Sequence, residues 1–240
     1  MAVTVVPRPS ANPTTQSSSD NGTTLRYLLI LDFEASCWES GSDVNQEIIE
    51  FPTLLYNIQE RKVEATFHKY VKPIQDPKLS EFCTKLTGIT QETVDAAETF
   101  PTVWRSFLAF LDEHGVLQDP ASYAFLCCGD WDMKTMLPKQ LDYEGSKNSN
   151  LQPLPPLLTE RWINVKKVFQ RKNHGRQAKG MVGMLHQLKL KLEGRHHSGI
   201  DDCRNIAKIV ERLQSSRGWT PGADGGEFTR GIPPRRRNRT

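Results

Sequence analysis

The sequence has 240 residues and a mass of 27.2 kDa, which suits one large domain or two small ones. Hydrophobic residues make up 37 % and charged residues 25 %. No stretch approaches the roughly 18 apolar residues of a membrane-spanning helix, which excludes a membrane protein. Apolar runs such as residues 27–31 exclude a fully disordered chain, so a soluble globular domain remains.

The net charge of +3 is concentrated near the end of the chain. Residues 217–240 carry six arginines against two acidic residues, a net +4, so residues 1–216 carry −1. A nearly neutral body does not hold nucleic acid by its overall field. If the protein acts on phosphate groups, metal ions must supply much of the positive charge locally.

The ordered domain is predicted to span residues 26–216. A disordered leader (1–25) and a disordered basic tail (217–240) are expected around it, because neither end shows apolar periodicity. Apolar runs predict five strands, at residues 27–31, 47–57, 63–71, 123–128 and 162–165. Helices are predicted at residues 80–86, 91–96, 100–114, from about 132 to 141, 179–190 and 200–213. This order predicts an α/β fold in which helices cover both faces of a mixed five-stranded sheet.

The five cysteines form no CxxC pair and lie in apolar surroundings, which is typical of reduced thiols. We therefore expect a cytoplasmic or nuclear protein. The basic cluster at residues 235–239 has three interpretations: a nuclear import signal, an arm that binds phosphate, or a solvated tail without a specific partner.

Asp32 and Glu34 stand two residues apart where the first predicted strand ends. In an extended chain, side chains two residues apart point to the same face. Two carboxylates placed in this way repel each other and lose hydration, a cost that Mg²⁺ or Mn²⁺ removes. The pair predicts a metal site, with the alternative that Asp32 caps the next segment and Glu34 is solvated.

Asp130 and Asp132 follow the strand predicted at residues 123–128. If that strand neighbours the first one, both carboxylates reach the sheet edge at which open α/β sheets bind ligands. Capping of the following helix accounts for one acidic residue, so one of the two is expected to be structural.

His197, Asp201 and Asp202 open the last predicted helix. Asp202 lies four residues before Ile206, which begins the apolar stripe of this helix, whereas Asp201 is rotated away by about 100°. A histidine beside a metal site can take a proton from water. His197 is therefore a candidate general base, with an ordinary surface residue as the alternative.

Six blocks of sequence resemble the DEDDh 3′→5′ exonuclease superfamily and, within it, the Eri-1-like 3′ exoribonucleases. The blocks are LDFEASCW from residue 31, EIIEFP from 47, LTGI from 86, CGDWDM from 128, WIN from 162 and HSGIDD from 197. As an ordered set they cover most of the chain. The resemblance implies an RNase H-like fold.

The resemblance also implies a site with two Mg²⁺ or Mn²⁺ ions. Asp32, Glu34 and Asp202 would bind the ion that activates water. Asp32 would bridge to a second ion that Asp132 supports, and His197 would be the general base. Asp132 is selected over the preceding aspartate because it follows a tryptophan, as in the family's block.

Substrate contacts are implied in the LTGI block, where side chains of the family pack on the terminal nucleotide. This points to Thr87 and Ile89. Trp38 is a further candidate, because aromatic side chains stack on bases and Glu34 is near in sequence. A place in the core or at its rim is the alternative for Trp38.

The sequence thus predicts a metal-dependent enzyme that hydrolyses single-stranded RNA from its 3′ end and releases 5′-nucleotides. The alternatives are an exonuclease that prefers DNA and a catalytically silent nucleic-acid-binding or scaffold protein on the same fold. The complete acidic set favours activity, because a silent protein has no physical reason to keep a repulsive cluster. The leader is too short for a further nucleic-acid-binding module and the cysteines do not suit a zinc domain, so specificity is expected from the nuclease surface.

Overall fold

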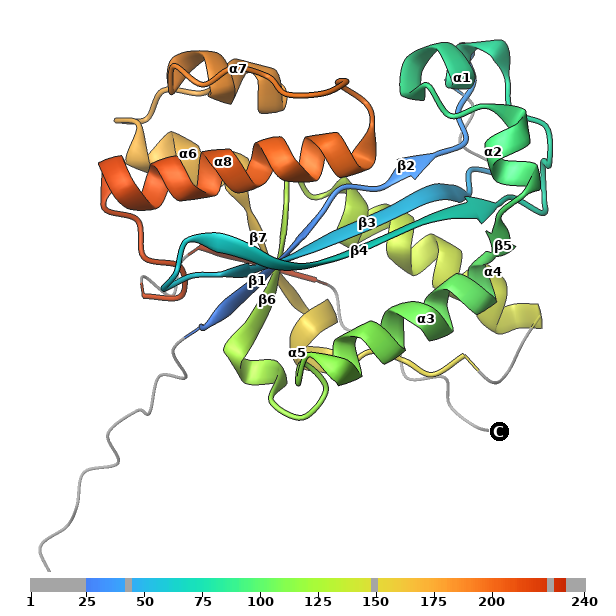
Figure 1. Cartoon of the computed structure of the whole chain (residues 1–240), viewed down its shortest axis with the longest axis horizontal. Coiled ribbons are helices and arrows are strands. Elements are labelled where there is room, and N and C mark those ends of the chain that lie inside the picture. Colours follow the sequence, from blue (N-terminus) through green and yellow to red (C-terminus); the bar gives the residue numbers. More distant parts are fainter. Residues whose placement is uncertain (1–24, 42–44, 148–150, 224–226, 232–240) are drawn as a thin grey trace, which may run out of the picture.

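A mixed sheet with helices on both faces forms the centre of the computed structural model, which describes residues 25–41, 45–147, 151–223 and 227–231 (Figure 1). The strands are β1 (Tyr27–Leu31), β2 (Glu34–Ala35), β3 (Ile48–Asn57), β4 (Lys62–Lys72), β5 (Glu98–Thr99), β6 (Tyr123–Cys127), β7 (Arg161–Asn164) and β8 (Phe228–Arg230). In the described residues their order is β5-β4-β3-β1-β6-β7-β8, with β2 paired to β3. The α/β class is confirmed. The sheet has eight strands rather than five, because β2, β5 and β8 are too short to show a periodic pattern.

The direction of the strands determines where the ends of β1 and β6 lie. β1 runs antiparallel to β3 and parallel to β6, and β6 runs parallel to β7. The carboxyl ends of β1, β6 and β7 therefore share one edge of the sheet. β1 is the continuous apolar run found in the sequence, and four of its five residues are buried, as a strand covered on both faces requires.

The helices lie on both faces of the sheet, and the first two pack together at one end of it (Figure 1). They are α1 (Glu81–Thr87), α2 (Gln91–Asp95), α3 (Phe100–Glu113), α4 (Leu137–Lys147), α5 (Pro156–Thr159), α6 (Val165–Lys172), α7 (Gly180–Gln187) and α8 (Gly199–Arg217). One core lies under α3 and contains Phe51, Trp104 and Phe107. The other lies under α6, α7 and α8 and contains Ile30 and Ile206. No helix in the described part of the chain combines the length and apolar content that crossing a bilayer requires.

Two helical segments differ from the expected pattern. α6 begins directly after β7, where no helix was predicted, and the side chain of Asn164 accepts a hydrogen bond from the N–H of Lys166 at 3.0 Å. This is the N-cap arrangement that starts a helix. α4 continues to Lys147, beyond the helix end predicted near residue 141, and a π-helical segment, Asp132–Met136, precedes it.

The segment expected as a disordered tail is folded from residue 217 to 223 and from 227 to 231. Trp219 is only 2 % exposed, and its indole N–H donates to the Glu227 carboxylate at 2.7 Å. β8 then pairs with the outer side of β7. The boundary predicted after residue 216 is therefore too early, because this segment buries an aromatic side chain and covers a strand. The rest of the predicted tail (232–240) and the predicted leader up to residue 24 lie outside the described residues, whereas Leu25 is buried.

Candidate active site

Four carboxylates from three distant parts of the sequence meet at the carboxyl ends of β1 and β6. Asp32 follows β1, Glu34 lies in β2, Asp132 begins the π-helical segment, and Asp202 lies in the first turn of α8. Carboxylate oxygens of Asp32, Glu34 and Asp202 lie within 4.8 Å of one another. Asp132 is held against this group because its Oδ1 accepts the backbone N–H of Phe33 at 2.9 Å.

The four carboxylates disfavour one another's ionisation. Burial, followed by the charges of Asp132 and Glu34, raises the pKa of Asp32 well above its usual value. Burial and the charge of Glu50 raise the pKa of Glu34 to about 9. The pKa of Asp132 rises to about 6 and that of Asp202 is also raised, in both cases because of burial. The positive groups nearby, Lys166 beside Asp132 and the histidines beside Asp202, do not offset the burial of these carboxylates.

This donor set fits a hard divalent cation, which prefers carboxylate oxygens. Among the described residues, no lysine or arginine forms an ion pair with any of the four carboxylates. Asp32, Glu34, Asp132 and Asp202 line a cleft of about 480 Å³. Acidic residues that could hold a metal thus line the cleft, and among the described residues they form no ion pair with lysine or arginine, although Lys179 also lines the cleft.

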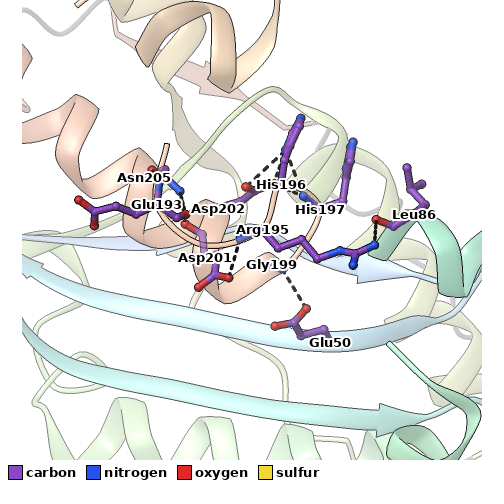
Figure 2. A network of polar contacts seen from close by, with 10 residues as sticks. All are labelled: Glu50, Leu86, Glu193, Arg195, His196, His197, Gly199, Asp201, Asp202 and Asn205. Atoms are coloured by element: carbon purple, nitrogen blue, oxygen red, sulfur yellow. Dashed lines mark hydrogen bonds and ion pairs between the residues drawn. The ribbon is translucent and has the colours of Figure 1, made fainter. Parts of the chain in front are cut away.

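Two adjacent histidines border the cleft on the loop before α8 (Figure 2). The backbone N–H of His197 donates to Oδ2 of Asp202 at 3.1 Å, and Nδ1 of His196 lies 3.1 Å from the same oxygen. The two rings stack with their centroids 3.9 Å apart. Burial, followed by the charge of His196, lowers the pKa of His197, which favours a neutral ring that can accept a proton. Both histidines are placed at the site, and the assignment of the base to His197 stays a prediction.

The neighbouring aspartates point away from the cleft. Asp130 accepts hydrogen bonds from the Trp162 indole at 3.0 Å, the Asn164 amide at 2.9 Å and Lys167 at 3.0 Å. Burial opposes ionisation of Asp130, but these donors outweigh it and lower its pKa. Asp201 pairs with Arg204 at 2.9 Å. This geometry agrees with the expectation that one of Asp130 and Asp132 is structural. It also agrees with the prediction that Asp202, and not Asp201, lies on the inward side of the last helix.

The three predicted substrate contacts lie beside the cleft rather than on its lining. Thr87 is 3 % exposed; its hydroxyl donates to the Cys83 carbonyl at 2.9 Å and accepts the N–H of Ile89 at 3.1 Å. Ile89 is buried in a small apolar cluster with Cys83. Trp38 is half-buried. Within the LTGI block it is Leu86 that lines the cleft. The three contacts stay predictions.

Glu50 is the buried residue at this site that the sequence analysis missed. It is 1 % exposed, and its carboxylate accepts the N–H group of Gly199 at 2.9 Å (Figure 2). The same carboxylate accepts the N–H group of Ile200 at 3.1 Å. His68 contacts it at 2.8 Å. Glu50 therefore caps α8 from a neighbouring strand, a role that Ser198 does not take. The sequence signal that could have indicated this role is a single acidic residue within the otherwise apolar run of β3.

Comparisons with known proteins agree with this geometry. Residues 29–210 match the exonuclease (RNase_T) family. ERI1 exoribonuclease 3 from Homo sapiens is 40 % identical over 187 residues, which cover 78 % of this chain and 53 % of that protein. The 3′-5′ exonuclease eri1 of Schizosaccharomyces pombe is 35 % identical over 219 residues, covering 83 % of this chain and 71 % of that protein.

A solved structure is also similar. It is the nuclease domain of 3′hExo, a DEDDh family member, bound to rAMP. The TM-score is 0.70 at 36 % identity, and the match covers 80 % of this chain and 94 % of that one. The chain spans about half the length of the mammalian relatives that it matches.

Proposed function

This chain belongs to the exonuclease family, and from that premise we propose that it is a metal-dependent 3′→5′ exoribonuclease. Its substrate would be the 3′ end of single-stranded RNA, and its products 5′-nucleotides. The observation that carries the proposal is the convergence of Asp32, Glu34 and Asp202 within 4.8 Å, in a cleft that Asp132 also lines. The names of the relatives and the rAMP bound to the similar nuclease domain support RNA as the substrate class.

Asp32, Glu34 and Asp202 would hold one Mg²⁺ or Mn²⁺ ion, and Asp32 with Asp132 a second. When bound, such ions neutralise phosphate charge and lower the pKa of water. Asp132 keeps its orientation through the N–H of Phe33. The mutual repulsion of the carboxylates favours cation binding, because it disappears when a cation is bound.

His197 would accept the proton of the attacking water. Its lowered pKa keeps the ring neutral near pH 7, as a general base requires. The hydrogen bond from its backbone to Asp202 fixes the loop relative to a metal-binding carboxylate. A proton acceptor and the acidic cluster are in this way held together by one short segment.

The terminal nucleotide would lie against the end of α1. Leu86 supplies the exposed part of this wall. Thr87 and Ile89 would act beside it, and the hydroxyl of Thr87 orders the backbone between them. Trp38 would stack on a base farther along the cleft.

We also propose a cytoplasmic or nuclear location. The five cysteines, all of which lie in the described residues, form no disulfide there, which supports a reducing compartment.

The deciding experiment uses end-labelled RNA and DNA, single- and double-stranded, with Mg²⁺ or with EDTA. We expect stepwise shortening of single-stranded RNA from its 3′ end in Mg²⁺ and none in EDTA. Asp32→Asn is the matched control and should leave the RNA intact. Binding without cleavage would support the silent nucleic-acid-binding alternative, and faster shortening of DNA would support a DNA exonuclease.

A further inference from the structure

The loop of residues 193–198, which carries both histidines, is fastened to α8 by three side chains (Figure 2). The Asn205 amide donates to the carbonyl of Glu193 at 2.7 Å. Asp201 accepts the N–H of Arg195 at 3.0 Å, and Asp202 accepts the N–H of His197. These contacts hold the backbone of the loop on the α8 side of the cleft.

The side chain of Arg195 extends from this loop to the opposite wall of the cleft. Its guanidinium donates to the carbonyl of Lys85 at 2.6 Å. It also lies 3.4 Å from the carbonyl oxygen of Leu86 (Figure 2). Both carbonyls belong to the last turn of α1, where backbone acceptors lack partners within the helix and a cation is favourable. Gly88 leaves the necessary room, because a Cβ there would lie 2.9 Å from Nε of Arg195.

The histidine loop is a segment that requires such support. His197 has a φ of +66°, a left-handed conformation that costs free energy for any residue with a Cβ. Gly194 has a φ of +69°, and a Cβ there would overlap the Asp201 carboxylate. A strained loop keeps one conformation only when surrounding contacts fix it.

We propose that Arg195 is a positioning residue that ties the nucleotide-facing wall at Leu86 to the loop carrying His197. It acts through Leu86 and His197, and it fixes the position of the terminal nucleotide relative to the general base, His197. This inference rests on the proposed function.

The first test compares the kinetics of Arg195→Ala and wild-type protein on single-stranded RNA with Mg²⁺. Losing a hydrogen bond to a charged donor should lower kcat about tenfold to a hundredfold. KM should change less than about threefold, because the cleft that binds the nucleotide remains. Arg195→Lys, or guanidinium ion added to Arg195→Ala, should restore part of kcat.

Arg204→Ala is the matched control. Arg204 is an exposed arginine that pairs with the same Asp201 carboxylate from the outer side of α8. It should keep the wild-type kcat. An equal loss in both variants, or an unchanged kcat in Arg195→Ala, would overturn the inference.

A second measurement does not depend on activity. Amide hydrogen exchange in peptides covering residues 85–89 and 193–198 should speed up in both segments of Arg195→Ala and in neither segment of Arg204→Ala. Unchanged exchange rates in both segments of Arg195→Ala would show that Arg195 does not hold the two segments together. If the wild-type protein cleaves no nucleic acid, the proposed function fails, and the exchange data still decide whether Arg195 joins the two segments.

Discussion

Two sets of buried carboxylates differ in what faces them. Glu47, Glu50 and Glu227 are at most 2 % exposed, and each accepts at least two N–H groups of the chain. In the part of the chain that the structure describes, Asp32 and Glu34 accept none and face other carboxylates instead. The first set stabilises the fold, whereas the second lowers its stability until a cation binds.

The contrast is clearest between Glu34 and Glu50, which lie opposite each other on β2 and β3. Glu50 meets the N-terminal N–H groups of α8, and Glu34 meets Asp32 and Asp202. Acidity and burial therefore do not distinguish a functional carboxylate from a structural one. What distinguishes Glu50 from Glu34 is that Glu50 accepts two backbone N–H groups, whereas Glu34 faces other carboxylates.

The largest expected effect comes from removing one charge of the acidic cluster that lines the cleft. Asp202→Asn should lower kcat on single-stranded RNA about a thousandfold or more, because a cation ligand worth several kcal/mol in the transition state is lost. The fold should persist, since the substitution relieves repulsion. Single-turnover assays in Mg²⁺, with circular dichroism to check folding, measure both.

Asp201→Asn is the neighbouring control for that prediction. Asp201 pairs with Arg204 and does not line the cleft. Asparagine keeps an oxygen that can accept the N–H of Arg195, so Asp201→Asn should change kcat less than about threefold. Equal loss in the two variants would show that the inward-facing side of α8 had been misassigned.

The second prediction separates the two stacked histidines. His197→Ala should lower kcat about a hundredfold or more, because general-base assistance is lost. His196→Ala should be milder and should chiefly weaken the binding of Mg²⁺, since its ring contacts Asp202. Titration of activity with Mg²⁺ for both variants distinguishes them. A larger kcat loss in His196→Ala would reverse the assignment.

The third prediction tests the first set through stability. Glu50→Gln should lower the free energy of unfolding by about 1.5–3 kcal/mol, because α8 loses part of its cap and His68 its partner. At this chain length that corresponds to a drop in Tm of roughly 2–4 °C per kcal/mol. Thermal unfolding in EDTA measures it. A rise in Tm would place Glu50 with the cation-binding set.

The fourth prediction concerns pH. The pKa of Glu34 rises from 4.5 to about 9 on folding, mainly through burial and the charge of Glu50. The folded state therefore holds a proton that the unfolded state releases, and stability should fall as pH rises between these values. In EDTA, Tm should drop from pH 5 to pH 8, and the drop should be smaller in Glu34→Gln. The same drop in both proteins would contradict the prediction.

The elements predicted correctly from sequence carry their information locally. β1 is a continuous apolar run and has the predicted bounds. The stripe from Ile206 determines which face of α8 is buried, and with it the direction of Asp202. The spacing of Asp32 and Glu34 needs only the geometry of an extended chain. Each of these depends on residues close together in the sequence.

The features that could not be predicted from the sequence depend on contacts with residues far away along the chain. Glu50 is recognisable as a cap only once Gly199, 149 residues later, lies beside it. β8 has three residues and exists because β7 offers an unpaired edge. Asp130 is structural because Trp162 and Asn164 reach it from the next strand. No local pattern contains these contacts.

The covering of β7 by β8 affects how the protein behaves in solution. Without β8 the backbone N–H and C=O groups of Arg161–Asn164 would form an open edge, onto which a strand of another molecule can add. The buried Trp219, whose indole donates to the Glu227 carboxylate, follows residue 216 as well. A shortened chain ending at residue 216 would therefore self-associate and precipitate, although every group that faces the cleft would still be present.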